Sequence, residues 1–420
     1  MIEVGAVVEP LGITSPVPMS GFAARTEPSA GEHDVLGARA LAMDETVLIT
    51  LDVCALEEST CRAIAEALRP EMPDQVIVTA THTHAGPCST PTRLARCTSE
   101  IELQLIHAAT AAGRAALEAR TPCDVEFRVA HGVGVAKNRR HSDRLVDPPV
   151  QLLRFTAVQD GEAKEARDIA ALVTYPCHPV VLDGTNQLLS GDYVHPLRQR
   201  LEAEHPGSVA VFATGCAGDL NTGHSAEASY SLQSTSTRTF AEAERIGTRI
   251  AEAALAGEPQ TVTADRVSSA SAPVTLRFDR PDAEKVAADS ASWARALATA
   301  DPGEAALLEV WLEWVCDRPE GTAWNGRVSA FRLGEITVVA LPGEPFLEAA
   351  EQISAQTAGP CLVLGYADGC PGYFPMAGEY PYGGYEVDDA HRYYGMPGPF
   401  AAGSAETLIQ RAVETCRALG

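Results

Sequence analysis

Apolar runs typical of buried strands alternate along this chain with amphipathic stretches typical of helices. The short runs are dominated by Val, Ile, Leu and Ala, as in strands that are buried on both faces. Helix-like stretches cover residues 58–68 and 99–120, and residues 283–316 predict one or two more helices. This alternation predicts an α/β fold in which mixed β-sheets are flanked by helices. The strand-like runs are residues 47–53, 75–80, 170–175, 209–213 and 336–341.

No internal repeat, low-complexity block or long linker interrupts this pattern. A chain of 420 residues is long enough for two or three ordinary domains, but no shift in composition marks a boundary. We therefore expect residues 1–420 to form a single domain.

Polar clusters follow directly after the predicted strands. Open sheets present ligand-binding groups at this end of their strands, so these clusters are the first place to look for a site. In chain order the candidate residues in them are His82 and His84, His178, Asp219, and Glu344.

His82 and His84 form the first candidate pair. If the strand continues through them, residues i and i+2 point to one face and both imidazoles project together. Two neutral imidazoles suit a zinc ion or acid–base work, but a pair of structural histidines is an equally good interpretation of so short a motif. His178, between a cysteine and a proline, and Glu344, in a Pro-Gly-Glu-Pro turn, each have an ordinary structural interpretation when taken alone.

A dense run of tyrosines among glycines and prolines occupies residues 372–386. This composition excludes a regular helix or a central strand. The predicted loop either lines a pocket, where phenols donate protons or bind a metal, or packs its aromatic rings against one another.

Charge and composition narrow the classes of function. A formal net charge of −24 and a pI near 4.8 argue against a nucleic-acid partner and against stable association with an anionic membrane. No stretch approaches the length of a membrane span, and the N-terminus lacks a targeting pattern. The 11 cysteines include no C-x-x-C pair, which predicts reduced, mostly buried thiols and a cytoplasmic location. The chain carries no signal for a particular oligomeric state.

Taken together, in this order and over nearly the whole chain, the motifs resemble the neutral/alkaline ceramidase family. Residues 80–87 (Ala-Thr-His-Thr-His-Ala-Gly-Pro) are similar to its T-H-T-H-S-G-P signature, and residues 341–344 (Leu-Pro-Gly-Glu) are similar to its P-G-E turn. The tyrosine-rich run keeps the spacing of the family's G-Y-V-T-T-x-E-Y…Y-E-G segment. Shorter similarities lie at residues 21–23, 33–40, 138–139, 147–148, 178–192 and 217–219.

The resemblance implies a ceramidase catalytic-domain fold without the family's C-terminal immunoglobulin-like domain, for which the chain leaves no room. It also implies a Zn²⁺ site of two imidazoles and two oxygen donors, a ligand set that suits zinc. The implied zinc ligands are His82, His178, Glu344 and Tyr373, and the residues placed around the reacting bond are His84, Arg139, Tyr382 and Tyr385. Asp192 and Asp219 are expected to orient the histidines.

The chain departs from the family at Asn221, where the family has a serine. An amide cannot act as that hydroxyl, but it can donate a hydrogen bond to an oxyanion, an interaction worth about 3 kcal/mol. Because this hydroxyl is lost and no segment faces a membrane, we expect a small acylated molecule as the substrate rather than ceramide.

These expectations combine into zinc-dependent hydrolysis of an amide (N-acyl) bond by a metal-activated water. His84 would act as acid and base, and Arg139 and a tyrosine would stabilise the oxyanion. The missing serine leaves two alternatives open. One is esterase, lactonase or non-hydrolytic chemistry at the same site, and the other is a non-catalytic metal-binding protein.

Overall fold

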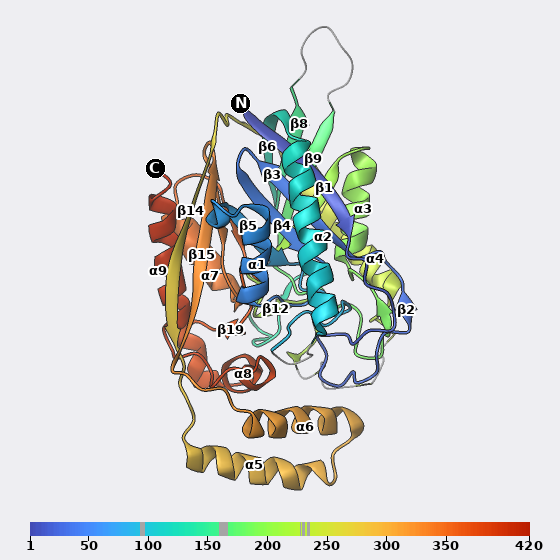
Figure 1. The fold of residues 1–420 in the computed structure, drawn as a ribbon, viewed down its shortest axis with the longest axis vertical. Coiled ribbons are helices and arrows are strands. Elements are labelled where there is room, and N and C mark those ends of the chain that lie inside the picture. The colour runs from blue at the N-terminus through green and yellow to red at the C-terminus, as the bar shows by residue number, and fades with distance from the viewer. Residues whose placement is uncertain (93–96, 159–166, 227, 229–231, 233–235) are drawn as a thin grey trace.

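Two β-sheets lie face to face, and helices cover their outer faces (Figure 1). The predicted α/β fold, with mixed sheets flanked by helices, is confirmed. The computed structural model describes residues 1–92, 97–158, 167–226, 228, 232 and 236–420.

The larger sheet has nine strands within the described residues and contains both parallel and antiparallel neighbours. In sheet order they are β11 (Val209–Thr214), β9 (Asp168–Tyr175), β8 (Val150–Ala157), β6 (Thr121–Ala130), β1 (Ile2–Pro10), β3 (Gly37–Met43), β4 (Thr46–Leu51) and β5 (Val76–Ala80), and β13 (Gln260–Val262) pairs with β6. The pairs β9–β11 and β4–β5 are parallel, so the carboxyl ends of each pair lie side by side.

The smaller sheet packs on the larger one through a shared apolar layer. In order, its strands are β14 (Val267–Arg277), β15 (Ala323–Leu333), β16 (Ile336–Ala340) and β18 (Cys361–Leu364). Alternate residues of both sheets, such as Phe155 in β8 and Val338 in β16, are buried in this layer. β16 and β18 are parallel, so their carboxyl ends also lie together.

Helices cover the two outer faces of this pair of sheets. On the larger sheet, α1 (Glu58–Leu68) and α2 (Ser99–Glu118) pack on the β3–β5 side, and α3 (Val194–Glu204) and α4 (Phe240–Ala256) pack on the β8–β11 side. On the smaller sheet, α7 (Leu347–Gln356) and α9 (Ser404–Arg417) do the same. The predicted helix 58–68 is confirmed. The helix predicted over 99–120 begins where Thr98 caps it by accepting the Ile101 N–H, and it ends at Glu118.

A separate helical pair, α5 (Ala283–Leu297) and α6 (Pro302–Cys316), lies below α8 (Ala390–Tyr393) in Figure 1. Three tryptophans of this pair surround the guanidinium of Arg392, whose Cζ lies 4.8, 4.8 and 5.8 Å from the rings of Trp293, Trp311 and Trp314. These cation–π contacts attach the pair to α8. Helices with packing tryptophans are therefore observed where residues 283–316 predicted them.

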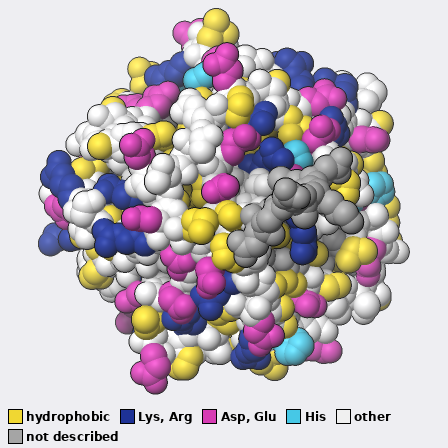
Figure 2. All heavy atoms as spheres, turned by 90° about the horizontal axis from the view of Figure 1, so that it is seen from above, with side chains coloured by type: hydrophobic (Ala, Val, Ile, Leu, Met, Phe, Trp, Pro, Cys, Tyr) yellow, Lys and Arg dark blue, Asp and Glu magenta, His cyan; other side chains and the backbone are white. Residues whose placement is uncertain are grey.

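The burial of the cysteines and the mixture of side chains on the surface agree with the composition. All 11 cysteines are free, and every one except Cys316 is buried, as predicted. The end of the molecule at the top of Figure 1 carries acidic and basic side chains interspersed with single hydrophobic ones (Figure 2). Among the described residues, no helix is both long and apolar enough to cross a membrane.

The parallel pairs direct their carboxyl ends toward one region, and the segments that leave β5, β9 and β16 there carry His82, His178 and Glu344. Two kinds of short element hold the loops around this region. Two-residue ladders pair β2 (Gly31–Glu32) with β10 (Leu188–Leu189), β7 (Lys137–Asn138) with β12 (Leu220–Asn221), and β17 (Glu344–Pro345) with β19 (Tyr373–Phe374). The tyrosine-rich run forms the 3₁₀ helix η3 (Ala377–Tyr382) and the π-helical turn η4 (Tyr385–Asp389).

Candidate metal centre and active-site cavity

His82 leaves β5 through a tight turn. Its φ is +63°, in the left-handed region that residues other than glycine rarely occupy. Its backbone N–H donates to the carbonyl oxygen of Val53 at 3.0 Å, which holds the turn against the end of β4. The strand does not continue to His84, so the expectation that strand alternation aligns the two imidazoles is wrong. The turn brings them together instead, with their Nε2 atoms 3.2 Å apart.

Backbone carbonyl groups fix the tautomers of His82 and His178. Nδ1 of His82 donates to the carbonyl oxygen of Cys54 at 2.6 Å, and Nδ1 of His178 donates to that of Leu220 at 2.9 Å. In each neutral ring Nε2 is then left with a lone pair and no hydrogen. These two nitrogens lie 3.3 and 2.9 Å from Oε2 of Glu344, which is also an acceptor. Three acceptors therefore converge on one point and need a cation between them.

The convergent atoms fit a zinc ion. His82, His178 and Glu344 are at most 1% exposed, and their ligand atoms all lie within 4.8 Å of one another. Zinc bonds of about 2.0–2.1 Å in tetrahedral geometry place neighbouring ligand atoms about 3.3 Å apart, close to the separations found here. Nε2 of His84 lies 3.2 Å from that of His82, but it is not close to all three ligand atoms, so His84 stands outside this set. The set can hold a metal ion with a position left for another ligand.

Without a metal, the cluster is expected to hold a proton. Burial disfavours a charged His82, but Glu344 and Cys54 together outweigh it and raise the pKa of His82 to about 10. Burial also disfavours the charged form of Glu344, yet His82 holds the pKa of Glu344 well below its usual range. Burial and Arg139 lower the pKa of His178 to about 4, and burial, His82 and His178 hold the pKa of His84 well below its usual value.

Metal binding at this cluster is expected to release a proton. Because metal-free His82 stays protonated up to about pH 10, zinc must displace that proton. The dissociation constant for zinc should then fall about tenfold per pH unit between about pH 7 and 9. Competition with a chromophoric chelator at several pH values measures the slope. A flat profile would show that His82 carries no proton in the metal-free protein, and the exposed His107, replaced by alanine, serves as the control.

Carboxylates do not orient the two imidazoles. Asp192 accepts hydrogen bonds from backbone N–H groups of the loop around it, including that of Val181 at 3.2 Å. Asp219 accepts from Asn138 and from the backbone N–H of Leu347, both at 2.9 Å. The prediction that Asp192 and Asp219 orient the histidines is therefore wrong, because these carboxylates are used to organise loops.

Two tyrosines that the sequence did not single out contact Glu344. The Tyr394 hydroxyl donates to Oε1, and the Tyr366 hydroxyl donates to Oε2 at 3.4 Å. Tyr366 also stacks on His82 with ring centroids 4.2 Å apart, and its φ of +57° is left-handed as well. His82 and Tyr366 thus both have an unfavourable left-handed backbone conformation, and such conformations are typical of functional positions. One feature of the sequence could have pointed to Tyr366, because this residue lies just past the strand β18.

Tyr373, the fourth ligand implied by the resemblance, lies beside Glu344 in the β17–β19 ladder. Its hydroxyl accepts a hydrogen bond from Nη2 of Arg139 at 3.0 Å. Burial and the Glu344 carboxylate hold the pKa of Tyr373 well above its usual range, which favours the neutral phenol. The role of Tyr373 as a metal ligand stays a prediction, and here its hydroxyl bonds to Arg139.

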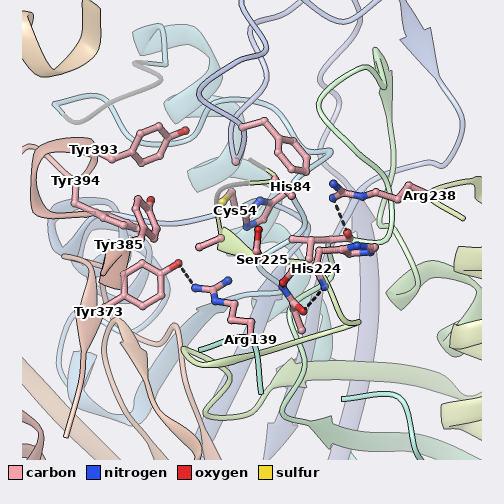
Figure 3. Close-up of a pocket in the computed structure, with 16 residues that line it drawn as sticks. Cys54, His84, Arg139, His224, Ser225, Arg238, Tyr373, Tyr385, Tyr393 and Tyr394 are labelled. Carbon is pink, nitrogen blue, oxygen red and sulfur yellow. Dashed lines mark hydrogen bonds between the residues drawn. The ribbon is translucent and has the colours of Figure 1, made fainter. Parts of the chain in front are cut away.

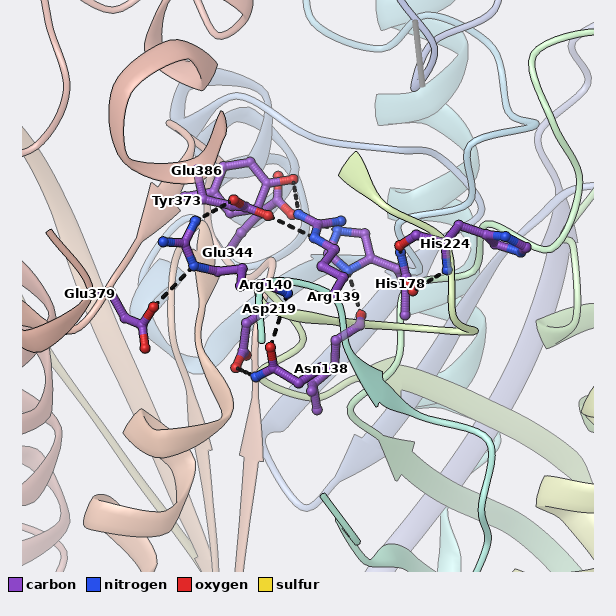
Figure 4. A network of polar contacts seen from close by, with 12 residues as sticks. Asn138, Arg139, Arg140, His178, Asp219, His224, Glu344, Tyr373, Glu379 and Glu386 are labelled. Carbon is purple, nitrogen blue, oxygen red and sulfur yellow. Dashed lines mark hydrogen bonds and ion pairs between the residues drawn. The ribbon is translucent and has the colours of Figure 1, made fainter. Parts of the chain in front are cut away.

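A network of ion pairs holds Arg139 and joins β7 to the tyrosine-rich loop (Figure 4). Nε of Arg139 donates to Oε1 of Glu386 at 2.8 Å, and Nη1 of Arg140 donates to the other oxygen of Glu386 at 2.6 Å. Nε of Arg140 also donates to Glu379 at 3.1 Å. These charged side chains are largely buried, so the network fixes the Arg139 guanidinium in one position.

A cavity lies beside the histidine cluster (Figure 3). Among the residues predicted from the sequence, it is lined by His84, Arg139, Asn221, Tyr373 and Tyr385. The lining residues that sequence reasoning did not place there include Phe22, Cys54, Val180, His224, Ser225, Arg238, Tyr393 and Tyr394.

Tyr382 lies outside this cavity. It is 70% exposed, and its ring packs edge-on against His141 with centroids 5.0 Å apart. The structure therefore does not bring Tyr382 together with the other predicted residues.

Asn221 lines the cavity, but its amide also organises its own loop. Nδ2 donates to the carbonyl oxygen of His224 at 2.7 Å, and Oδ1 accepts from the N–H groups of Gly223 and His224 at 2.8 and 3.0 Å. One hydrogen of the amide is already used. The predicted donation to an oxyanion thus depends on the second hydrogen alone.

The fold has counterparts among solved structures. The crystal structure of neutral ceramidase from Pseudomonas aeruginosa matches with a TM-score of 0.73 and 17% sequence identity, over 100% of this chain and 74% of that chain. A structure of ceramidase complexed with C2 matches with the same TM-score and identity, over 100% of this chain and 75% of that chain. No protein-family model matches the sequence, and no curated protein matches it. The chain therefore has the fold of the neutral ceramidases, as its motifs predict.

Proposed function

We propose that this chain is a zinc-dependent hydrolase that cleaves an amide (N-acyl) bond of a small molecule. The observation that carries the proposal is the convergence of three buried acceptor atoms, on His82, His178 and Glu344, beside a cavity with acid–base and cationic groups. The motif resemblance and the shared fold support the same reading. The free cysteines support a reducing, cytoplasmic compartment.

His82, His178 and Glu344 would hold the ion. When bound, zinc would supply the Lewis acidity that polarises an acyl carbonyl and lowers the pKa of a water molecule to about 7. The carbonyl groups of Cys54 and Leu220 keep both imidazoles in the tautomer that this role needs.

His84 would move the proton. Burial and the neighbouring imidazoles hold its pKa well below the usual value, so the ring is neutral at pH 7 and can accept a proton from the attacking water. The imidazolium formed is then a strong acid beside the leaving group. It returns the proton to the amine nitrogen as the C–N bond breaks, so that water supplies OH to the acyl carbon and H to the nitrogen.

Arg139 would stabilise the oxyanion. Glu386 and Tyr373 hold its guanidinium in place before any substrate binds, and a preorganised cation needs no rearrangement as charge develops. Tyr385 and Asn221 line the same cavity and are the further candidate donors.

Metal analysis and turnover together test the proposal. Wild type, His82→Ala and Glu344→Ala are purified in parallel, and we expect about one zinc per chain in the wild type and its loss in both variants. Zinc-loaded wild type is then offered amides, esters and lactones with matched acyl groups. Faster turnover of amides supports the proposal.

The other outcomes separate the alternatives. A preference for esters or lactones identifies the chain as an esterase or lactonase with the same site. Tight zinc binding without turnover of any acyl compound identifies a non-catalytic metal-binding protein. A wild-type protein that binds no metal overturns the zinc site itself.

A further inference from the structure

A buried arginine at the cavity wall has no carboxylate partner. Arg238 is 8% exposed and reaches the cavity from the segment that precedes α4 (Figure 3). Its Nε and Nη2 donate to the carbonyl oxygens of Val180, Val181 and Leu182 at distances of 3.0 to 3.3 Å. Within the described part of the chain, no carboxylate lies at ion-pair distance from Arg238, and its Nη1 has no hydrogen-bond partner.

The acidic side chains that act on Arg238 have other hydrogen-bond donors, although Oδ2 of Asp183 has no partner among the described residues. Asp183 and Asp192 act on it electrostatically, but only from beyond ion-pair distance. Asp183 accepts from the Thr185 hydroxyl at 2.6 Å, and Asp192 accepts from three backbone N–H groups.

A second buried cation packs against the same phenylalanine as Arg238, although it does not line the cavity. Arg25 is 7% exposed and donates to backbone carbonyl oxygens, among them that of His84 at 2.6 Å. The two guanidinium groups lie over the ring of Phe22, with Cζ atoms 5.1 and 5.6 Å from its centroid. Of these two cations, Arg238 is the one that lines the cavity, and Asp183 and Asp192 act on it without forming an ion pair.

Burying a guanidinium against neutral carbonyl groups costs free energy, because dipoles replace only part of the lost hydration. Arginine retains this charge at any physiological pH, and its planar fork matches the two oxygens of a carboxylate. A bound anion would restore the missing partner.

We infer that the substrate carries a carboxylate that binds Arg238, so that this hydrolase acts on N-acyl amino acids. The inference rests on the proposed function. Phe22 sets the spacing, because its ring lies under Arg238 and also contacts the His84 ring edge-on, with centroids 5.2 Å apart. The proposed carboxylate site and the acid–base histidine therefore both adjoin Phe22 in one cavity, as a substrate that carries a carboxylate near its amide requires.

Hydrolysis of such a substrate balances simply. The C–N bond of the amide breaks, the acyl carbon gains OH from water, and the nitrogen gains the proton. A carboxylic acid and a free amino acid leave. Val180 and the rings of Tyr393 and Tyr394, which line the same cavity, provide an apolar surface for the acyl chain.

The first test compares two ligands that differ only in the carboxylate. N-acetyl-leucine and N-(3-methylbutyl)acetamide share the acyl group, the amide and the side chain. For zinc-loaded wild type we expect kcat/KM about ten- to a hundredfold higher for N-acetyl-leucine, the range of one charged hydrogen-bonded contact. Calorimetric titration with both compounds gives a binding readout that does not depend on turnover.

The second test locates the carboxylate. Arg238→Gln should bring the ratio of kcat/KM for N-acetyl-leucine to kcat/KM for the neutral amide close to one, and Arg238→Lys should recover part of the wild-type ratio. Arg245→Gln, on the exposed side of α4, is the matched control and should keep the wild-type preference. Because Arg238→Gln also loses bonds to three carbonyl groups, thermal unfolding is recorded for each variant.

The outcomes distinguish the two proposals. If neither compound is hydrolysed, the proposed function fails, but tighter binding of N-acetyl-leucine by wild type than by Arg238→Gln still supports anion recognition. If the neutral amide binds and reacts as well as N-acetyl-leucine, the inference is overturned while the hydrolase stands. A preference that persists in Arg238→Gln also overturns it, because the carboxylate is then held elsewhere.

Discussion

Replacing His178 by alanine is expected to lower kcat by more than about a hundredfold and to reduce the zinc content of the purified protein. His178 is fully buried, and its Nε2 lies 2.9 Å from Oε2 of Glu344. The substitution therefore removes one of the three convergent ligands of the proposed metal site. Steady-state kinetics on the best acyl substrate, beside metal analysis of the same preparation, measure both effects.

A matched control separates the chemistry from general damage. His107 is an exposed histidine on α2, and His107→Ala should keep both zinc content and kcat. Circular dichroism must show that His178→Ala is folded. Undiminished kcat in folded His178→Ala would contradict the assignment of the site.

Replacing Asp52 by alanine is expected to lower the free energy of unfolding by about 3–5 kcal/mol, because it leaves the charge of Arg198 buried without a partner. Asp52 and Arg198 are 1% and 2% exposed, and two hydrogen bonds of 2.8 Å join them. The carboxylate also accepts the Gly37 N–H at 3.0 Å. Chemical denaturation of wild type and variant, with equal slopes, measures the difference.

The pair also has a defined pH dependence. Burial acts to raise the pKa of Asp52, but Arg198, the Gly37 N–H and Arg39 together outweigh it, so the pKa is lowered. A carboxyl with a depressed pKa stabilises the fold above its unfolded-state pKa and loses that contribution as the pH falls through the folded-state pKa. The contribution of Asp52 should therefore be complete at neutral pH and vanish in strong acid.

Two comparisons test this explanation. Arg62 and Glu66 form an exposed pair on α1, and Glu66→Ala should cost less than about 0.5 kcal/mol. The double variant Asp52→Leu with Arg198→Met should be more stable than Asp52→Ala, because no buried charge is left without a partner. If Asp52→Ala is no more harmful than Glu66→Ala, the buried pair contributes nothing.

Local patterns alone were enough to predict many of the elements. The apolar runs before His82, His178 and Glu344 are strands in the structure, because an uninterrupted apolar segment of that length is stable when it is buried between layers. The position of these residues just past strand ends also indicated a common site, since parallel strands present their carboxyl ends together.

Contacts between distant segments could not be predicted in this way. The carbonyl oxygens that set the tautomers belong to Cys54 and Leu220, which lie 28 and 42 positions away from the histidines they bind. Which backbone oxygen approaches an imidazole depends on strand order and on the loops between strands, and neither leaves a periodic pattern in the sequence. The same reason applies to Tyr394 at Glu344.

The sequence by itself therefore determined the α/β elements, the resemblance to the ceramidases and the identity of the candidate ligands. Only the tertiary structure decided how these residues meet. It turned His82 out of its strand, left Tyr382 at the surface and placed Arg238 at the cavity wall. Hydrophobic periodicity records which face of an element is buried, whereas a site depends on the packing of several elements whose order the periodicity does not contain.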